Sequence, residues 1–384
     1  MKTIVYISPH VDRYGAERSM IANIRNIMKH GVNVLLIIPT HGCIEELLEK
    51  YSINYVIEKF YDVINHEDRV RIHYGIGKAI VNTYKAFKIR KYITKNKLNP
   101  VVVHSNSITS DFGVILSLIL KVPHIQHIRE LGEYDFGMTF DLGINHFSKF
   151  VGKSKKIICI SDAVYDYYKN YLPENKMIKI YNGVSIDANE LLSNRDANEI
   201  GVTNIVLVGR LSEEKGQLQA IQAIEMIKDK ILVHLDLWGD GIDRAMLETY
   251  VRQHKLESYV KFCGYSPDIP YSKYQIALVC SKYEAFGRVT VEYMFHGLPV
   301  IGVNTGGTRE IIQNNITGLL YENGAIEELE KAILKVAQDA AFRNRLSIAG
   351  FKRANEEFSE KVYCGKVYRI YEEICPMLEE NNID

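Results

Sequence analysis

The chain alternates short, predominantly apolar runs with longer stretches in which apolar residues recur every three or four positions. Short apolar runs are typical of strands buried in a parallel sheet, and the longer spacing is typical of amphipathic helices. Runs of the first kind lie at residues 3–7, 34–38, 55–57, 101–103, 125–128 and 156–160, and again at 204–210, 232–237, 260–262, 276–280 and 299–303. Strands that alternate with helices predict an α/β fold with parallel sheets and right-handed crossovers.

A polar stretch separates two regions that are built alike. It follows an Asn-Gly turn signal at 182–183 and has no sustained apolar period. We predict an N-terminal acceptor-binding domain at 1–184, a linker at 185–203 and a C-terminal nucleotide-binding domain at 204–358. A last helix within 359–384 is expected to cross back to the first domain. The length of 384 residues fits two domains.

Composition narrows the class of protein. The 47 basic and 47 acidic side chains balance, so overall charge does not indicate a nucleic-acid partner. The 6 cysteines are scattered without a Cys-x-x-Cys pair, which indicates reduced thiols and neither a disulfide framework nor a zinc site. No apolar run is long enough to span a membrane. We therefore expect a cytoplasmic protein, with peripheral binding at the inner face of the cell membrane left open.

One segment is strongly basic. Residues Arg69–Asn99 carry many Lys and Arg side chains and no Asp or Glu, with aromatic and aliphatic residues interleaved. A basic amphipathic helix is typical of binding to an anionic membrane surface. The solvated face of an ordinary helix explains the pattern equally well, so both interpretations stand.

The pair Glu284 and Glu292 marks the most informative stretch. It follows the apolar run 276–280, and the residues from Gly287 onward have helical spacing. A glycine at a helix start lets a ligand approach bare backbone, and the free N–H groups of the first turn attract anions. Carboxylates on both sides suit a ligand that carries phosphate and hydroxyl groups. Two solvated glutamates beside an ordinary helix start are the alternative.

Two other strand ends carry comparable patterns. Arg210 ends the strand stretch at 204–210 and Lys215 follows it, and a guanidinium with an ammonium suits a pyrophosphate. Paired glycines precede Glu310, and such glycines permit contact between the backbone and a ligand. We expect Glu310 to begin a helix. Solvated cations and a simple tight turn are the respective alternatives.

The first half offers weaker signals. The loop that contains Gly15 has no Gly-x-Gly-x-x-Gly, so a nicotinamide-dependent enzyme is disfavoured. Gly15 still lets the loop pass close to a phosphate or sugar. His127 ends an apolar strand and is a candidate contact to a sugar or a nucleophile, or else a core-edge histidine bonded to backbone.

Together these residues resemble the retaining nucleotide-sugar glycosyltransferases of the GT-B fold, relatives of bacterial polysaccharide and phosphatidylinositol mannosyltransferases. The specific signal is four motifs in the family's order, Gly209-Arg210…Lys215-Gly216, Glu284-x7-Glu292, Gly297-x-Pro299-Val300 and Gly306-Gly307-x-x-Glu310. The resemblance implies two Rossmann-like domains with parallel sheets that face each other across a cleft.

The resemblance also implies roles for individual residues. Arg210 and Lys215 would bind the donor diphosphate and stabilise the leaving group. Glu284 would hold hydroxyls of the transferred sugar, close to backbone N–H groups of Phe286, Gly287 and Arg288. In this chain Arg288 replaces a residue that is commonly apolar in the family.

Further positions complete the implied site. Glu292 would bind the ribose hydroxyls, and Gly264 and Tyr265 would face the nucleobase. Gly15 would approach the phosphate from the other domain, and His127 would lie near the donor sugar and the reacting bond. The implied catalytic set is then Glu284, His127, Arg210 and Lys215.

The implied reaction transfers a sugar with retention at the anomeric carbon and needs no protein nucleophile, metal or other cofactor. The donor is a nucleotide-sugar, UDP-linked rather than GDP-linked, and the acceptor is a glycan or lipid-linked molecule in bacterial surface polysaccharide or glycolipid synthesis. A nucleotide-sugar epimerase or hydrolase, and a non-catalytic sugar-nucleotide-binding partner, are the competing hypotheses.

Overall fold

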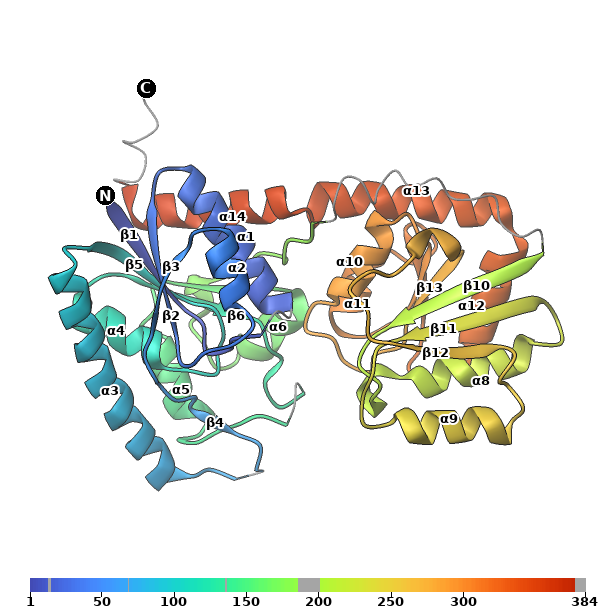
Figure 1. Ribbon diagram of the computed structural model, residues 1–384, viewed down its shortest axis with the longest axis horizontal. Coiled ribbons are helices and arrows are strands. Elements are labelled where there is room, and N and C mark those ends of the chain that lie inside the picture. The colour runs from blue at the N-terminus through green and yellow to red at the C-terminus, as the bar shows by residue number, and fades with distance from the viewer. Residues whose placement is uncertain (13–14, 68, 135–136, 186–200, 377–384) are drawn as a thin grey trace. The chain divides into compact units, whose positions relative to one another are not determined.

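The computed structural model describes residues 1–12, 15–67, 69–134, 137–185 and 201–376 (Figure 1). It separates into two compact units. Unit 1 comprises Met1–Gly183 together with Glu360–Asp384, and unit 2 comprises Val184–Ser359. Each unit has its own sheet and hydrophobic core. Most of the predicted linker, residues 186–200, lies outside the described residues.

Unit 1 is built on a seven-stranded parallel sheet in the order β3-β2-β1-β5-β6-β8-β9. Its strands are β1 (Lys2–Ile7), β2 (Asn33–Ile38), β3 (Asn54–Ile57), β5 (Asn99–Ser105), β6 (His124–Ile128), β8 (Lys156–Cys159) and β9 (Met177–Lys179). A separate antiparallel pair joins β4 (Ile64–Asn65) to β7 (Thr139–Phe140). The central strands are buried on both faces, which explains their nearly continuous apolar sequence.

Helices cover both faces of this sheet. On one face α1 (Gly15–Lys29) and α14 (Glu360–Ile374) pack side by side over a core that includes Ile4 and Val102 (Figure 1). On the other face α3 (Ile72–Lys95) and α4 (Phe112–Leu120) cover a second core. The remaining helices of unit 1 are α2 (Glu45–Lys50), α5 (Ile144–Val151) and α6 (Asp162–Tyr168), with short 3-10 turns at Gly132–Tyr134 and Glu174–Lys176.

Unit 2 is built on a six-stranded parallel sheet in the order β12-β11-β10-β13-β14-β15. Its strands are β10 (Val202–Val208), β11 (Leu232–Trp238), β12 (Val260–Gly264), β13 (Ile276–Val279), β14 (Val300–Val303) and β15 (Gly318–Tyr321). Its helices are α8 (Gln217–Ile227), α9 (Arg244–Gln253), α10 (Arg288–Phe295), α11 (Gly306–Ile311), α12 (Ile326–Gln338) and α13 (Ala340–Glu357), with 3-10 turns at Glu213–Lys215 and Tyr271–Lys273.

The predicted fold class is confirmed, because both sheets consist of parallel strands that alternate with helices. Some details were wrong or missed. Helix α11 begins at Gly306, so Glu310 lies in its last turn and does not open it. Strand β10 begins at Val202, inside the stretch predicted as linker. Strands β9 and β15 were not predicted because they are short, with 3 and 4 residues. Among the described residues, no helix has the length and apolar character needed to cross a membrane.

Candidate functional site

The sheet order of unit 2 places the predicted charges next to each other. The chain proceeds from β10 to β11 on one side, and β13 lies against β10 on the other side. The loops that follow β10 and β13 therefore open from adjacent strands at the carboxyl edge of the sheet. In open α/β sheets this switch point is where ligands bind. Arg210 and Lys215 lie on the first loop, and Glu284 lies on the second.

A glycine brings these two loops into contact. Gly216 has a φ of 68°, and a Cβ at this position would lie 2.1 Å from the carbonyl oxygen of Cys280, at the end of β13. Only glycine allows this close approach in that backbone conformation. The Lys215 Nζ then donates to the Glu284 Oε1 over 2.5 Å. The two side chains are 31% and 20% exposed, so the ion pair remains open to solvent.

The paired glycines Gly306 and Gly307 support the same loop from the far side. Gly307 N donates to the carbonyl oxygen of Glu284 over 2.8 Å. A Cβ on Gly306 would lie 2.5 Å from that oxygen, and a Cβ on Gly307 would lie 2.2 Å from the carbonyl oxygen of Phe286. The Gly-Gly motif therefore has a structural role, because the loop that carries Glu284 packs directly on its backbone.

Helix α10 begins beside this loop. Gly287 caps it with a φ of 89°, a conformation that favours glycine. Arg288 is the first residue of α10, and its Nε lies 3.4 Å from the Oε1 of Glu292, one turn further along the helix. Two fully buried hydroxyls, those of Thr290 and Thr308, lie next to Gly287 and have no hydrogen-bond partner among the described residues. The helix start thus combines a glycine with positive φ, a charged pair and two buried hydroxyls without partners among the described residues.

The other predicted residues of unit 2 lie at the same edge of the sheet. Arg210 is exposed after β10, and its carbonyl oxygen accepts from Gln217 Nε2 over 2.8 Å. Gly264 ends β12 with a φ of 76°, and Tyr265 beyond it is 78% exposed. The structure therefore brings Lys215 directly to Glu284, and it places Arg210, Gly264 and Tyr265 on neighbouring strand ends.

In unit 1, His127 is the last residue but one of β6 and is fully buried. Its Nδ1 lies 3.3 Å from the Nε2 of His104, and its own Nε2 has no hydrogen-bond partner among the described residues. Burial, followed by the positive charge of Arg129, lowers the pKa of His127 well below its usual value. The ring is therefore neutral near pH 7, and its partner is another side chain instead of the backbone.

Arg129 is a residue of this edge that the sequence did not single out. It is 6% exposed and donates to Asn106 Oδ1 over 2.8 Å, to Asn182 Oδ1 over 2.5 Å and to Tyr363 Oη over 3.1 Å. Its position immediately after a buried strand was the one feature of the sequence that could have indicated a functional role for Arg129. Its partners come from distant segments, including α14, so the sequence alone did not reveal the cluster.

The N-terminal turn of α1 contains a buried glutamate. The helix begins at Gly15. Glu17 is only 2% exposed, and its Oε1 has no hydrogen-bond partner among the described residues. Burial raises the pKa of this carboxyl group. A buried acid beside a helix start was not predicted, because the charge pattern of the sequence reads as a normal N-terminal turn.

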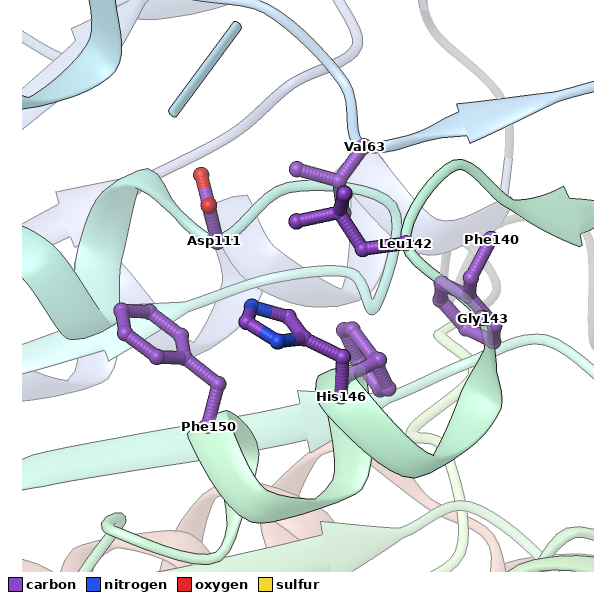
Figure 2. A pocket seen from close by; sticks show the side chains of 8 residues that line it. Val63, Asp111, Phe140, Leu142, Gly143, His146 and Phe150 are labelled. Atoms are coloured by element: carbon purple, nitrogen blue, oxygen red, sulfur yellow. The ribbon is translucent and has the colours of Figure 1, made fainter. Parts of the chain in front are cut away.

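Unit 1 also has a small hollow of about 20 Å³ away from the residues predicted as functional. Figure 2 shows its walls, with His146 and Phe150 from α5 facing Asp111, and with Leu142 at its side. Burial raises the pKa of Asp111 to about 6. The lining is mostly apolar and consists of Val63, Asp111, Phe140, Leu142, Gly143, His146, Phe147 and Phe150.

Metal ligands do not cluster in the part of the chain that the structure describes. There, no group of three or more His, Cys, Asp or Glu side chains is placed to hold an ion. Independence from metal therefore stays a prediction.

Comparisons with known proteins identify the family. The model for group 1 glycosyl transferases matches residues 194–353, and that for glycosyltransferase family 4 matches residues 14–188. An uncharacterized glycosyltransferase of Methanocaldococcus jannaschii, MJ1178, is 30% identical over 322 residues, which cover 81% of this chain and 85% of that protein. The chain belongs to the group 1 glycosyltransferases.

Solved structures agree on the fold of this glycosyltransferase. Anabaena HepE, crystallised in complex with UDP, superimposes with a TM-score of 0.80 at 19% identity and covers 97% of this chain and 100% of its own. Sucrose-phosphate synthase from Thermosynechococcus elongatus gives a TM-score of 0.73 at 16% identity, over 98% of this chain and 100% of its own. The GT-B fold is therefore confirmed.

Proposed function

We propose that the enzyme is a retaining, metal-independent glycosyltransferase that moves a sugar from a nucleoside diphosphate donor to a glycan or lipid-linked acceptor. The observation that carries the proposal is the Lys215–Glu284 ion pair, which lies at the switch point of a sheet in a chain that belongs to the glycosyltransferases. A partly exposed ammonium–carboxylate pair can exchange its partners when a ligand arrives.

On binding, the donor would separate this ion pair, with Lys215 contacting the diphosphate and Glu284 contacting the sugar. A diphosphate carries more negative charge than one carboxylate, so it would attract Lys215 and the nearby Arg210. Glu284 would then be free to accept hydrogen bonds from hydroxyls of the sugar, next to the backbone N–H groups of Phe286, Gly287 and Arg288. Cations that stabilise the leaving diphosphate lower the barrier for departure without a metal ion.

The ribose and the base of the donor would bind along the carboxyl edge of the unit 2 sheet. Glu292 on the first turns of α10 would accept from the ribose hydroxyls, and Gly264 and Tyr265 would face the base. UDP is the favoured nucleotide, and the UDP complex of the similar HepE supports this choice. From unit 1, Gly15 would contact the phosphate and His127 would contact the sugar.

Surface chemistry of α3 favours an acceptor at an anionic membrane. Ile76, Ile80, Tyr84 and Phe87 follow helical spacing and are about half to two-thirds exposed. Basic residues Arg90, Lys91 and Lys95 are exposed on the following turns. Apolar side chains that enter the headgroup region beside basic side chains are the pattern of peripheral membrane helices. We propose bacterial surface polysaccharide or glycolipid synthesis as the setting.

The hollow of unit 1 lies beside this helix. Leu142, in its wall, packs against Gly75 of α3. At about 20 Å³ the hollow has room for about one water molecule, so the membrane setting rests on the surface of α3. Vesicle co-sedimentation tests this setting: binding to phosphatidylglycerol and not to phosphatidylcholine is expected, and it should weaken in both Lys91→Gln and Phe87→Ser. Equal binding to both vesicles would contradict it.

Release of UDP in the presence of acceptor tests the enzyme reaction. Glu284→Ala and Lys215→Ala should each reduce release by about a hundredfold or more. Lys230→Ala is the matched control, because it breaks another lysine–carboxylate pair of unit 2, with Glu330 at 2.7 Å. Unchanged release in the two site variants would overturn the assignment of the site. The anomeric configuration of the product, read by NMR, tests retention.

Product analysis also separates the competing functions. An epimerase or hydrolase would change the donor without any acceptor. A non-catalytic partner would bind UDP-sugars in calorimetry without releasing UDP for any acceptor in a broad panel.

A further inference from the structure

A chain of buried polar side chains, which we call the histidine relay, runs through unit 1. It consists of Asn23, Tyr6, Tyr371, His104 and His127, each at most 1% exposed. They come from α1, β1, α14, β5 and β6 in that order. On β1 and β5, Tyr6 and His104 occupy paired positions in the register, and their rings stack with centroids 4.7 Å apart.

Hydrogen bonds link every neighbouring pair of the relay. Asn23 Nδ2 donates to Tyr6 Oη over 2.5 Å and also lies 3.4 Å from Tyr371 Oη. The hydroxyls of Tyr6 and Tyr371 bond to each other. Tyr371 Oη lies 2.5 Å from His104 Nδ1, and His104 Nε2 lies 3.3 Å from His127 Nδ1.

The first member sets the direction of this chain. The amide nitrogen of Asn23 only donates, and a tyrosine hydroxyl has one hydrogen to give. Tyr6 therefore accepts from Asn23 and gives its hydrogen to Tyr371. Tyr371 in turn donates to His104 Nδ1, which leaves the His104 proton on Nε2. That proton points to Nδ1 of His127, so the His127 proton resides on Nε2.

The opposite direction leaves more groups unsatisfied. If His127 Nδ1 donated to His104, each hydrogen would shift one member toward Tyr6. The hydroxyl hydrogen of Tyr6 would then have no acceptor among the described residues. His127 Nε2 would still be unpartnered. Among the described residues, each direction leaves one buried donor without an acceptor, the Nε2–H of His127 or the hydroxyl of Tyr6, and Asn23 Oδ1 lacks a partner in both. Only the opposite direction leaves His127 Nε2 unpartnered as a further group, so the first direction is favoured.

We propose that the relay fixes His127 as a neutral ring protonated on Nε2, and that Tyr371 of the C-terminal helix is the positioning residue that sets this tautomer. In this state His127 is a hydrogen-bond donor and not a proton acceptor. The unpartnered Nε2–H suits an oxygen of the sugar or of the phosphate. This last step rests on the proposed function, whereas the tautomer itself rests only on unit 1.

The surroundings agree with a neutral ring. Burial lowers the pKa of both His104 and His127 well below the usual histidine value, and the positive charge of Arg129 lowers both further. Arg129 is itself held by Tyr363 Oη at 3.1 Å. Helix α14 therefore contacts both the relay and its nearest cation.

Nitrogen-15 NMR of the ¹⁵N-histidine-labelled full-length protein tests the proposal. Long-range proton–nitrogen correlations identify the ring nitrogen that carries the proton, and a His127→Gln sample assigns the signals. Wild-type protein is expected to show His127 protonated on Nε2 only. Tyr371→Phe, which removes the donor to His104, should yield a mixture of both tautomers. Protonation of His127 on Nδ1 in the wild type, or an unchanged tautomer in Tyr371→Phe, would overturn the relay.

Tyr368→Phe is the matched control. Tyr368 lies one turn before Tyr371 on α14, is similarly buried, and stacks on His30 at 4.0 Å, away from the relay. It should leave the His127 signals unchanged. A tautomer mixture in this control would assign the effect to general disturbance of α14 and overturn the role of Tyr371.

Kinetics then separate the relay from the proposed function. Tyr371→Phe is expected to lower kcat about twofold with a smaller change in KM, because the donor hydrogen bond is lost in the fraction of molecules that hold the other tautomer. Full activity together with a mixed tautomer would overturn the positioning role. Failure of all nucleotide-sugars to bind wild-type protein would instead overturn the proposed function, while the NMR result decides the tautomer independently.

Discussion

The two units present polar side chains at the carboxyl edges of similar parallel sheets, but they hold them in different ways. In unit 1, His127 and Arg129 are buried and fixed by hydrogen bonds to segments far apart in the sequence. In unit 2, Lys215 and Glu284 form a partly exposed pair on loops that glycines bring together. The first arrangement presets one hydrogen-bonding state, and the second leaves charges able to change partners.

The largest expected difference between the units is the loss of stability of unit 1 in acid. Burial keeps the pKa of His104, His124 and His127 below the ordinary value of 6.5, to about 3 for His124. Below pH 6.5 the unfolded chain binds protons that these folded rings do not, so the free energy of unfolding decreases as the pH is lowered. Each ring costs about 2 kcal/mol between pH 6.5 and 5. Asp111, whose pKa is raised to about 6, recovers about 1 kcal/mol because its folded form binds a proton first.

Urea unfolding at pH 7.5 and pH 5 measures this difference. Trp238 is the single tryptophan of the chain and lies on β11, so its fluorescence reports unit 2. Far-ultraviolet circular dichroism reports both units. At pH 5 we expect the dichroism to show a transition at lower urea than the fluorescence. Coincident shifts of the two signals would contradict the separate acid sensitivity of unit 1.

Gly307→Val tests the glycine-built loops of unit 2. A side chain at this position meets the carbonyl oxygen of Phe286, 2.2 Å from the Cβ, so the loop that carries Glu284 must move. We expect a loss of about 3 kcal/mol of unfolding free energy in the fluorescence-detected transition, together with loss of UDP-sugar binding. Gly365→Ala is the control, since no atom lies within 4 Å of its Cβ in α14. Wild-type nucleotide binding in Gly307→Val would refute the steric argument.

Tyr6→Phe removes one hydroxyl from the buried relay of unit 1. The change leaves Asn23 and Tyr371 each short of a partner, so a loss of about 1–2 kcal/mol is expected in urea unfolding. Tyr55→Phe deletes a hydroxyl that bonds at 3.0 Å to Glu45 near the surface, and it should cost less than about 0.5 kcal/mol. Equal costs for the two variants would mean that burial does not strengthen the relay.

Lys215→Ala should have the smallest effect on stability. The pair with Glu284 is partly exposed and screened by solvent, so unfolding free energy should change by no more than about 0.5 kcal/mol. Activity should nevertheless collapse in the same variant, as proposed above. A destabilisation of more than about 2 kcal/mol would show that the pair is structural, and the contrast between the units would disappear.

Several parts of this picture follow from local patterns. The apolar runs located most strands of both sheets, because a strand buried on both faces must be almost wholly apolar. The run predicted as a strand at 276–280 is observed as β13 at Ile276–Val279. Short strands such as β9 escaped prediction, since three partly buried residues carry too little pattern. Helix α11 was misplaced because its start is decided by the packing of Gly306 on Glu284.

The sequence by itself determined the fold class and the order of the motifs, because apolar periodicity and glycine positions are local properties of the chain. Only the tertiary structure decided which charges meet. Lys215 reaches Glu284 because β10 and β13 are neighbours in the sheet, although 69 positions separate the two residues. Likewise, Tyr371 and Tyr363 of α14 bond to His104 and Arg129, although both tyrosines look like ordinary core residues in the sequence. Long-range pairing depends on strand order and helix packing, and no local pattern records it.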